Sequence, residues 1–307
     1  MSVISPPAPP TGDDSGAWIT HRAVTGRRRV VNTIATSWMI GSLLIALVPV
    51  VVIAVYVVSR GAAVINVGFL TKNMQIVTAL RGGGIAPAIV GTLVITGVAA
   101  LMAIPLGVLA AVYLNEYGRS NRTANVVRFM ADVMTGVPSI VMGLFVATIW
   151  VSAGLHFGYS GFAGSLALGA LMLPIVIRSC EEMLKLVPDD LRQASDALGA
   201  RRWRTVSSVV LPAALPGIVS GAMLAVARAA GETAPLLLTI GITNKINSNP
   251  FKGTNTTLSK VIWDNAQTPF DAAKDRAWGA ALTLIVIVFV FTVVARIVAA
   301  RFATARR

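Results

Sequence analysis

The chain has 307 residues, of which 55% are hydrophobic and only 13% are charged, and its mean hydropathy is +0.74. Soluble globular proteins carry about a quarter charged residues, so this composition excludes a soluble domain and predicts a surface that mostly faces lipid. The formal net charge is +13, but the basic residues lie between apolar segments and at both ends instead of in one patch. This distribution is typical of topology signals, and we expect a lipid bilayer and no nucleic acid as partner.

Residues 1–35 are predicted to form a disordered basic tail in the cytoplasm. The segment contains prolines at positions 6, 7, 9 and 10, a stretch rich in glycine and aspartate at 12–16, and the arginine run Arg27–Arg29. Such a segment has too few apolar side chains to fold by itself. The arginines next to the first apolar run hold this end of the chain in the cytoplasm. Residues 36–307 are then predicted to form one transmembrane domain.

Six apolar stretches are long enough to cross a bilayer, which takes about 20 residues per helix. They run roughly over Ser37–Val58, Ile85–Tyr117, Val126–Ala153, Gly161–Arg178, Ala213–Ile240 and Trp278–Ala300. The second stretch would be about 45–50 Å long as one helix, and we expect an interruption at Pro105. The third contains Gly136-Val137-Pro138-Ser139. The sequence therefore predicts an all-α membrane protein with six transmembrane helices.

The basic residues predict the orientation of these spans. The connections near residues 59–84, 154–160 and 241–277 carry few basic residues for their length, whereas the two tails and the connections at 116–128 and 178–212 carry many arginines. Because positive charge marks the cytoplasmic side, both termini and the 178–212 connection are predicted to be cytoplasmic. An even number of spans agrees with termini on one side.

The connection at 179–212 has the pattern of two short helices. Pro188-Asp189-Asp190 is a favourable helix start, because negative charge lies near the positive end of the helix dipole. The apolar and small residues that follow recur at three- and four-residue steps and form one face of an amphipathic helix; they are Leu191, Ala194, Ser195 and Leu198. Gly199 then fits a left-handed C-terminal cap. Amphipathicity alone leaves open whether this face docks a partner or packs on its own protein.

Charged residues inside apolar spans are functional candidates, because an ionised side chain near the bilayer centre costs several kcal/mol. Arg228 lies roughly 16 Å into the fifth span, and Glu232 follows one turn later, where the two side chains can pair. Arg178 lies at the end of the fourth span with Glu181 three residues later. A buried structural pair at Arg228 and an interfacial pair at Arg178 are the alternatives.

The spacing of the cytoplasmic connection resembles the EAA loop of ABC-importer permeases. That loop has Glu-Ala-Ala, three residues, Gly, nine residues and Ile-x-Leu-Pro. Its pattern corresponds here to Gln193, Ala194, Ser195, Gly199, Val209, Leu211 and Pro212. This sequence departs from it at Gln193, Ser195 and Val209, which replace Glu, Ala and Ile.

Three further stretches resemble the A-type permease subunit of bacterial phosphate-specific ABC importers. Residues 228–235 read Arg-Ala-Ala-Gly-Glu-Thr-Ala-Pro, like the RxxGETAP stretch of that family. Residues 178–188 resemble its RxxEEML..VP stretch, and residues 136–140 resemble its GxPSI motif. The resemblance covers most of residues 85–300.

The resemblance implies a type I ABC-importer permease fold and a multi-pass location in the bacterial cytoplasmic (inner) membrane. It implies that ATPase subunits dock at Gln193, Ala194, Ser195, Gly199, Leu211 and Pro212. The family's functional charges correspond to Arg178, Glu181 and Arg228. It also implies an assembly with a homologous C-type permease subunit, two ATPase subunits and an extracytoplasmic phosphate-binding protein, with ATP and Mg bound by the ATPases.

The chemistry of these charges fits phosphate. Phosphate at neutral pH carries between one and two negative charges, and the planar fork of arginine suits its oxygens. We expect Arg178 and Arg228 to pass phosphate along the path, and Glu181 and Glu232 to balance them in the unloaded state.

Two other functions remain open at this stage. A sulfate or molybdate importer also moves an oxyanion and has an EAA loop. An ATP-independent carrier or channel would have acidic residues at the midplane for coupling ions. The sequence has no G-x-x-x-x-G-K-[ST] loop, nucleophile elbow or metal-ligand cluster, so we expect a transporter subunit without its own catalytic site, metal or cofactor.

Overall fold

The computed structural model describes residues 26–118, 121–152 and 157–304. These residues fall into two units that divide between Val55 and Tyr56. In the described ranges all regular elements are helical, with twelve α-helices and three π-helical segments. The predicted all-α class is therefore confirmed.

Helix α1 (Gly26–Ala62) provides the first apolar span. In residues 26–55, the part of α1 that belongs to the first unit, the large apolar side chains are exposed, Ile45 and Ile53 among them. Such exposure is expected for a helix that lies in lipid. The helix begins at Gly26, so residues 26–35, which we assigned to the disordered tail, are helical. Arginine is a good helix former, and no glycine or proline separates the basic run from the apolar one. Residues 1–25 of the predicted tail lie outside the described residues.

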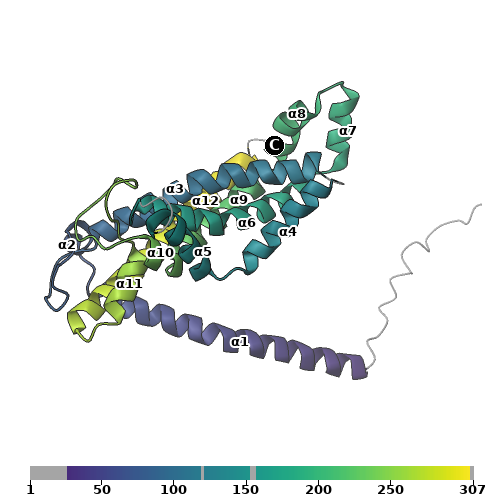
Figure 1. Cartoon of the computed structure of the whole chain (residues 1–307). Coiled ribbons are helices and arrows are strands. Elements are labelled where there is room, and N and C mark those ends of the chain that lie inside the picture. Colours follow the sequence, from purple (N-terminus) through teal and green to yellow (C-terminus); the bar gives the residue numbers. More distant parts are fainter. Residues whose placement is uncertain (1–25, 119–120, 153–156, 305–307) are drawn as a thin grey trace, which may run out of the picture. The chain divides into compact units, whose positions relative to one another are not determined.

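The second unit is a bundle of long helices. Its core consists of α3 (Ala86–Val112), α6 (Gly161–Lys185) and α9 (Leu211–Gly231), with α12 (Asp271–Thr304) packed along α9. The largest fully buried apolar side chains of this core are Ile95, Leu168, Met172, Leu184, Val176, Val210, Leu236 and Ile240. Figure 1 shows these helices side by side.

The second span continues through Pro105, and the predicted interruption is wrong. Helix α3 contains Pro105 in its interior and passes directly into the π-helical segment η1 (Tyr113–Tyr117), so one run extends over Ala86–Tyr117. Proline is tolerated inside membrane helices because neighbouring helices and local changes in helix geometry satisfy the freed backbone groups. The same tolerance holds in α6, which contains Pro174.

The third predicted span is not one straight helix. Helix α4 (Arg122–Gly136) and the following α5 (Ser139–Val146) with η2 (Ala147–Ser152) are bent by 104° at the break between them. Val137 and Pro138 have extended backbone conformations there, because a proline disfavours the helical conformation of the residue before it. The predicted end at Ala153 lies outside the described residues.

The fifth predicted span is also broken. Helix α9 ends at Gly231, Glu232 is extended with ψ 134°, and a short helix α10 (Ala234–Thr239) follows. The Ser259 hydroxyl donates a hydrogen bond of 3.0 Å to the Glu232 carbonyl oxygen, so the freed backbone acceptor at the break is satisfied.

The two ends of the bundle carry different elements. Helices α7 (Asp189–Ala197) and α8 (Arg202–Thr205) lie at one end, and α2 (Val67–Thr71) and α11 (Leu258–Ala266) lie at the opposite end (Figure 1). Phe69, Ile85 and Leu258 belong to a second buried cluster at the latter end.

Within the described ranges, five helices are long and apolar enough to cross a membrane, and the bent pair α4 and α5–η2 makes up to six. The predicted six spans therefore correspond to five long helices and one broken one. The fourth and sixth are longer than predicted, since α6 continues to Lys185 and α12 begins at Asp271.

Gly143 allows α5 to approach α10 closely, and this contact yields a prediction. A Cβ at Gly143 would lie 2.5 Å from the Pro235 Cα atom, which is backbone and cannot move aside. Gly143→Ala is therefore expected to destabilise the fold by about 1–3 kcal/mol through overpacking. Thermal unfolding of the detergent-solubilised full chain measures this effect. The control is Gly97→Ala in α3, where a Cβ meets no atom within 4 Å; equal melting temperatures for the two variants would contradict the prediction.

Candidate transport site and docking helix

The connection between the fourth and fifth spans forms a helix that projects from the bundle. Helix α7 begins at Asp189, directly after Pro188 as its N-cap residue, with Asp189 and Asp190 in the first turn. The predicted helix start is confirmed. Because α6 continues to Lys185 and α8 begins at Arg202, the part between the long helices is shorter than the predicted 179–212 loop.

Gly199 ends α7 as predicted. Its φ is +74°, its N–H donates to the Asp196 carbonyl at 2.9 Å, and the Ala200 N–H donates to the Ser195 carbonyl at 3.2 Å. This pair of hydrogen bonds is a Schellman motif, which requires the left-handed conformation that glycine adopts without strain. The Ser195 hydroxyl also lies 2.9 Å from the Thr205 hydroxyl, so the turn joins α7 to α8.

The apolar face of α7 does not pack on its own protein. Every residue of α7 is exposed or half-buried, Gln193 and Ala194 are exposed, and the Leu198 side chain that follows is 89% exposed. The Trp203 ring of α8 is exposed as well. The structure therefore does not show the alternative in which this face packs on its own protein, and docking of a partner stays a prediction.

Leu211 and Pro212 lie within a continuous helical run. The segment η3 (Val206–Val210) connects α8 to α9, so the run extends over Arg202–Gly231 and both residues are half-buried in it. The fifth span therefore begins before Ala213. Pro212 directly follows the π-helical turn η3, in which the Leu211 N–H donates to the Val206 carbonyl five residues earlier. Such a local change in helix geometry is one of the ways in which a membrane helix tolerates proline.

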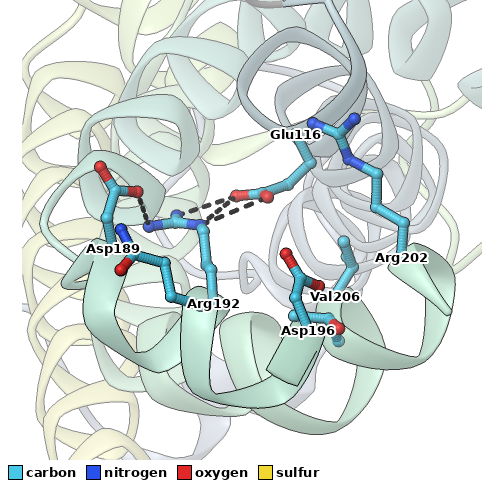
Figure 2. A pocket seen from close by; sticks show the side chains of 8 residues that line it. Glu116, Asp189, Arg192, Asp196, Arg202 and Val206 are labelled. Carbon is cyan, nitrogen blue, oxygen red and sulfur yellow. Dashed lines mark hydrogen bonds and ion pairs between the residues drawn. The ribbon is translucent and has the colours of Figure 1, made fainter. Parts of the chain in front are cut away.

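The ion pair of Arg192 with the buried Glu116 connects α7 to the long helices. Arg192 of α7 donates from Nη2 to Oε1 of Glu116 at 2.9 Å and from Nε to both carboxylate oxygens (Figure 2). The same guanidinium donates to the carbonyl oxygens of Leu184 at 3.0 Å and Val187 at 2.7 Å, at the end of α6. Glu116 belongs to the π-helical end of the second span and is buried. One arginine thus connects α7 to two spans.

A cavity of about 420 Å³ lies beside this pair. Its lining combines both signs of charge: Glu116, Asp189, Arg192, Gln193, Asp196, Arg202, Thr205 and Val206. The Arg192 guanidinium also pairs with the Asp189 carboxylate at 2.9 Å, and the Arg202 guanidinium lies over the Tyr117 ring at 5.4 Å. Sequence analysis treated Arg192 only as a topology signal and missed Glu116, although an acidic residue directly after an apolar run is a visible feature.

The predicted pair of Arg178 and Glu181 belongs to a larger ionic cluster between α4 and α6. Glu181 is fully buried, and its strongest partner is Arg128 of α4, whose Nε lies 2.8 Å from Oε1. Arg178 and Lys185 each lie 3.5 Å from the Glu181 carboxylate. Arg128 also donates to the Leu114 carbonyl at 2.7 Å. Glu181 is thus buried and paired across helices, whereas the Arg178 and Lys185 side chains are 32% and 47% exposed.

Asp132 completes the cluster. Its carboxylate Oδ1 pairs with Nη2 of Arg178 across α4 and α6. Arg128 and Asp132 both lie within the third predicted span, and charged residues in such a span are functional candidates. The sequence analysis singled out neither residue, because their partners on α6 lie 53 and 46 positions away, beyond any local pattern. Arg178 itself lies seven residues before the end of α6, about 10 Å along the helix, and not at its end.

Arg228 is differently placed. It does not lie in the middle of a continuous span but in the last turn of α9. At that end of a helix a cation interacts favourably with the negative end of the helix dipole. Its side chain is 70% exposed, and its Nε lies 3.9 Å from Oε1 of Glu232 at the helix break. This distance is too long for a hydrogen bond. The predicted pair is present, but it is a loose contact and not a buried structural pair.

The two arginines lie at different levels of the bundle. Helices α6 and α9 pack closely and antiparallel, since a Cβ at Gly217 would touch Met183 and one at Gly221 would touch Ser179. Arg228 follows Gly221 by seven residues, so it lies about 10 Å along the helix axis from the level of Arg178. In the described part of the chain, no ion pair joins Arg228 to the Arg178 cluster.

Comparison with known proteins gives consistent relatives. Residues 103–307 match the family described as "Binding-protein-dependent transport system inner membrane component". The chain is 45% identical to "Phosphate transport system permease protein PstA 1" of Mycobacterium tuberculosis (strain ATCC 25618 / H37Rv), covering 94% of this chain and 93% of the relative. It is 40% identical to "Phosphate transport system permease protein PstA" of Yersinia pestis, covering 94% and 97%.

Solved structures show the same fold. A chain of a bacterial ABC transporter involved in the import of the acidic polysaccharide alginate aligns with a TM-score of 0.61 at 17% identity, covering 89% of this chain and 99% of that one. A chain of the MetNI methionine ABC transporter in an inward facing conformation aligns with a TM-score of 0.56 at 19% identity, covering 71% and 94%. The spans, the projecting helix and the close sequence relatives agree: this chain belongs to the PstA family of phosphate transport system permease proteins, within the binding-protein-dependent inner membrane components.

Proposed function

We propose that this chain is a membrane subunit of an ATP-driven importer that moves inorganic phosphate into the cytoplasm. The observation that carries the proposal is the placement of α7. Its outer surface is exposed, while Arg192 on its inner side is bonded to the ends of two spans. A helix held in this way transmits an external movement to the spans. The names of the relatives supply phosphate as the cargo.

The docking surface would comprise the exposed residues of α7 and of the turn after it. Gln193, Ala194 and Leu198 are exposed, Gln193 at the cavity beside Glu116, and a matching groove on an ATPase subunit would bury them. Ser195 and Gly199 shape the turn through the Schellman motif, while Leu211 and Pro212 belong to the helical run that carries movement into the fifth span. The four residues would therefore support docking without contacting the ATPase.

The phosphate path would use the arginines at two levels. Arg228 is exposed and has only a loose contact with Glu232, so its guanidinium is available to an anion. The Arg178 side chain is 32% exposed and lies about 10 Å away along the bundle, toward α7. Glu181 would position Arg178 and not bind cargo, since its carboxylate is buried and bonded to Arg128.

The assembly and orientation follow the family. We propose that a homologous C-type permease subunit completes the path, that two ATPase subunits bind ATP and Mg, and that an extracytoplasmic binding protein delivers phosphate. Both termini and α7 would lie on the cytoplasmic side of a bacterial membrane, in agreement with the arginine distribution. The family description already names a binding-protein-dependent system of the inner membrane.

The selectivity of uptake tests the cargo. Vesicles that hold the chain with its partners are expected to take up labelled phosphate, and an excess of sulfate or molybdate is expected to leave the rate unchanged. Inhibition by sulfate at concentrations similar to those of phosphate would favour a general oxyanion importer. Uptake without ATP would favour the carrier or channel alternative.

A further inference from the structure

In the ionic cluster between α4 and α6, an acidic side chain pairs with Arg178, one of the two arginines proposed to bind phosphate. Asp132 of α4 pairs with Nη2 of Arg178, while Nη1 of the same guanidinium lies 3.5 Å from Glu181. The two partners differ in access. The Asp132 side chain is 55% exposed, whereas Glu181 is fully buried.

Glu181 does not depend on Arg178 for its charge balance. Arg128 lies 2.8 Å from its Oε1, and Lys185 lies 3.5 Å from the same oxygen. Asp132 has no such second cation among the ion pairs of the described residues. The direct partner of Arg178 is therefore Asp132, and Arg178 is the cation on which Asp132 depends.

We propose that Asp132 is a displaceable counter-ion that occupies, on Arg178, the position that phosphate takes during transport. The inference rests on the proposed function, in which Arg178 contacts phosphate. A carboxylate and a phosphate both present two oxygens to the fork of a guanidinium. When phosphate arrives it replaces one anion by another, and Arg178 is never left without a negative partner.

The helices remain joined when this exchange takes place. The Arg128 guanidinium still bonds Glu181 of α6 and the Leu114 carbonyl, so the release of Asp132 requires only a rotation of its own side chain. Asp132 also lies one turn before the break that follows Gly136, near the end of α4. The structure thus separates the two tasks: Arg128 holds the helices together, and Asp132 competes with the cargo.

The competition has a defined consequence for affinity and release. An internal carboxylate that occupies Arg178 most of the time lowers the apparent affinity of phosphate by the fraction of time that the arginine is free. It also displaces phosphate from the arginine and so speeds its departure. Asp132 therefore sets how weakly the path binds its cargo.

The test is direct binding of inorganic phosphate to the assembled, detergent-solubilised permease–ATPase complex without the binding protein. Asp132→Asn is expected to raise the affinity by at least about fivefold, because the neutral amide does not compete for the guanidinium. Asp132→Ser is expected to do the same, and Asp132→Glu to retain the affinity of the unmodified complex. The control is Glu182→Gln, which removes an equally exposed carboxylate that pairs with Lys185, and which is expected to change nothing.

Every outcome of this experiment either supports or overturns the counter-ion role of Asp132. Unchanged or weaker phosphate binding in both neutral variants overturns the inference, and so does failure of both to assemble, since Asp132 would then be a structural tie. If Asp132→Glu raises the affinity as much as Asp132→Asn, the carboxylate charge is not the cause. Arg178→Gln distinguishes failure of the counter-ion from failure of the proposed function. Normal uptake in Arg178→Gln refutes the role of Arg178 in the phosphate path. Lost uptake in Arg178→Gln, together with unaltered phosphate affinity in Asp132→Asn, refutes only the counter-ion role of Asp132.

Discussion

Arg228→Gln is expected to lower the rate of phosphate uptake by at least about 30-fold while the complex still assembles. A charge-assisted contact with an anion contributes roughly 2–3 kcal/mol, and each 1.4 kcal/mol corresponds to a factor of ten. Assembly is spared because the Arg228 side chain is 70% exposed and its contact with Glu232, the one ion pair that it makes among the described residues, is loose. The substitution therefore leaves no tightly paired buried charge without its partner.

Two further variants make the Arg228 experiment specific. Arg228→Lys keeps the positive charge without the planar fork and is expected to retain part of the activity. Arg301→Gln removes an exposed arginine from the end of α12 and is expected to leave uptake unchanged. The measurement is the initial rate of labelled phosphate uptake, with co-purification of the ATPase subunits as the test of assembly. Uptake at the normal rate in Arg228→Gln would remove this residue from the path.

Arg192→Ala is expected to uncouple ATP hydrolysis from transport. The substitution leaves the Glu116 carboxylate buried without its cation, a loss that typically costs about 3–5 kcal/mol, and it frees the carbonyl oxygens of Leu184 and Val187. Helix α7 would then move without moving the spans. We expect phosphate uptake to fall at least about tenfold, while the ATPase subunits remain bound through the outer surface of α7 and continue to hydrolyse ATP.

A double substitution provides the matched control for this coupling. Arg192→Gln combined with Glu116→Gln removes both charges and leaves no buried ion unpaired. The loss of uptake in this double variant is therefore expected to be smaller than the sum of the losses in the two single variants. Uptake and hydrolysis are measured on the same preparations. Joint loss of uptake, hydrolysis and bound ATPase in Arg192→Ala would instead make Arg192 part of the docking contact.

Local patterns were sufficient for the elements that depend on local chemistry. The apolar stretches predicted the spans, the aspartates after Pro188 predicted the start of α7, and Gly199 predicted its left-handed end. These features are decided by residues within a few positions of each other. The EAA-like spacing rests on a resemblance to a family instead, and the docking that it implies stays a prediction.

Tertiary contacts decided what the sequence could not. Pro105 and Pro138 both stand in apolar stretches, yet α3 continues through the first and the chain breaks at the second. The ion pairs of Arg128 with Glu181 and of Arg192 with Glu116 join residues 53 and 76 positions apart, and no local period reveals such partners. The break at Glu232 likewise depends on α11, whose Ser259 satisfies the freed carbonyl.

ATP-dependent phosphate uptake in vesicles is the decisive test of a phosphate path that ATPase subunits drive through α7. The vesicles hold this chain with its C-type partner, the two ATPase subunits and the binding protein, and a second preparation omits only the ATPase subunits. We expect phosphate uptake that requires ATP, that disappears without the ATPase subunits and that excess sulfate does not reduce. Phosphate uptake of equal rate in the preparation without ATPase subunits would contradict it, because the path would then work without any force applied to α7.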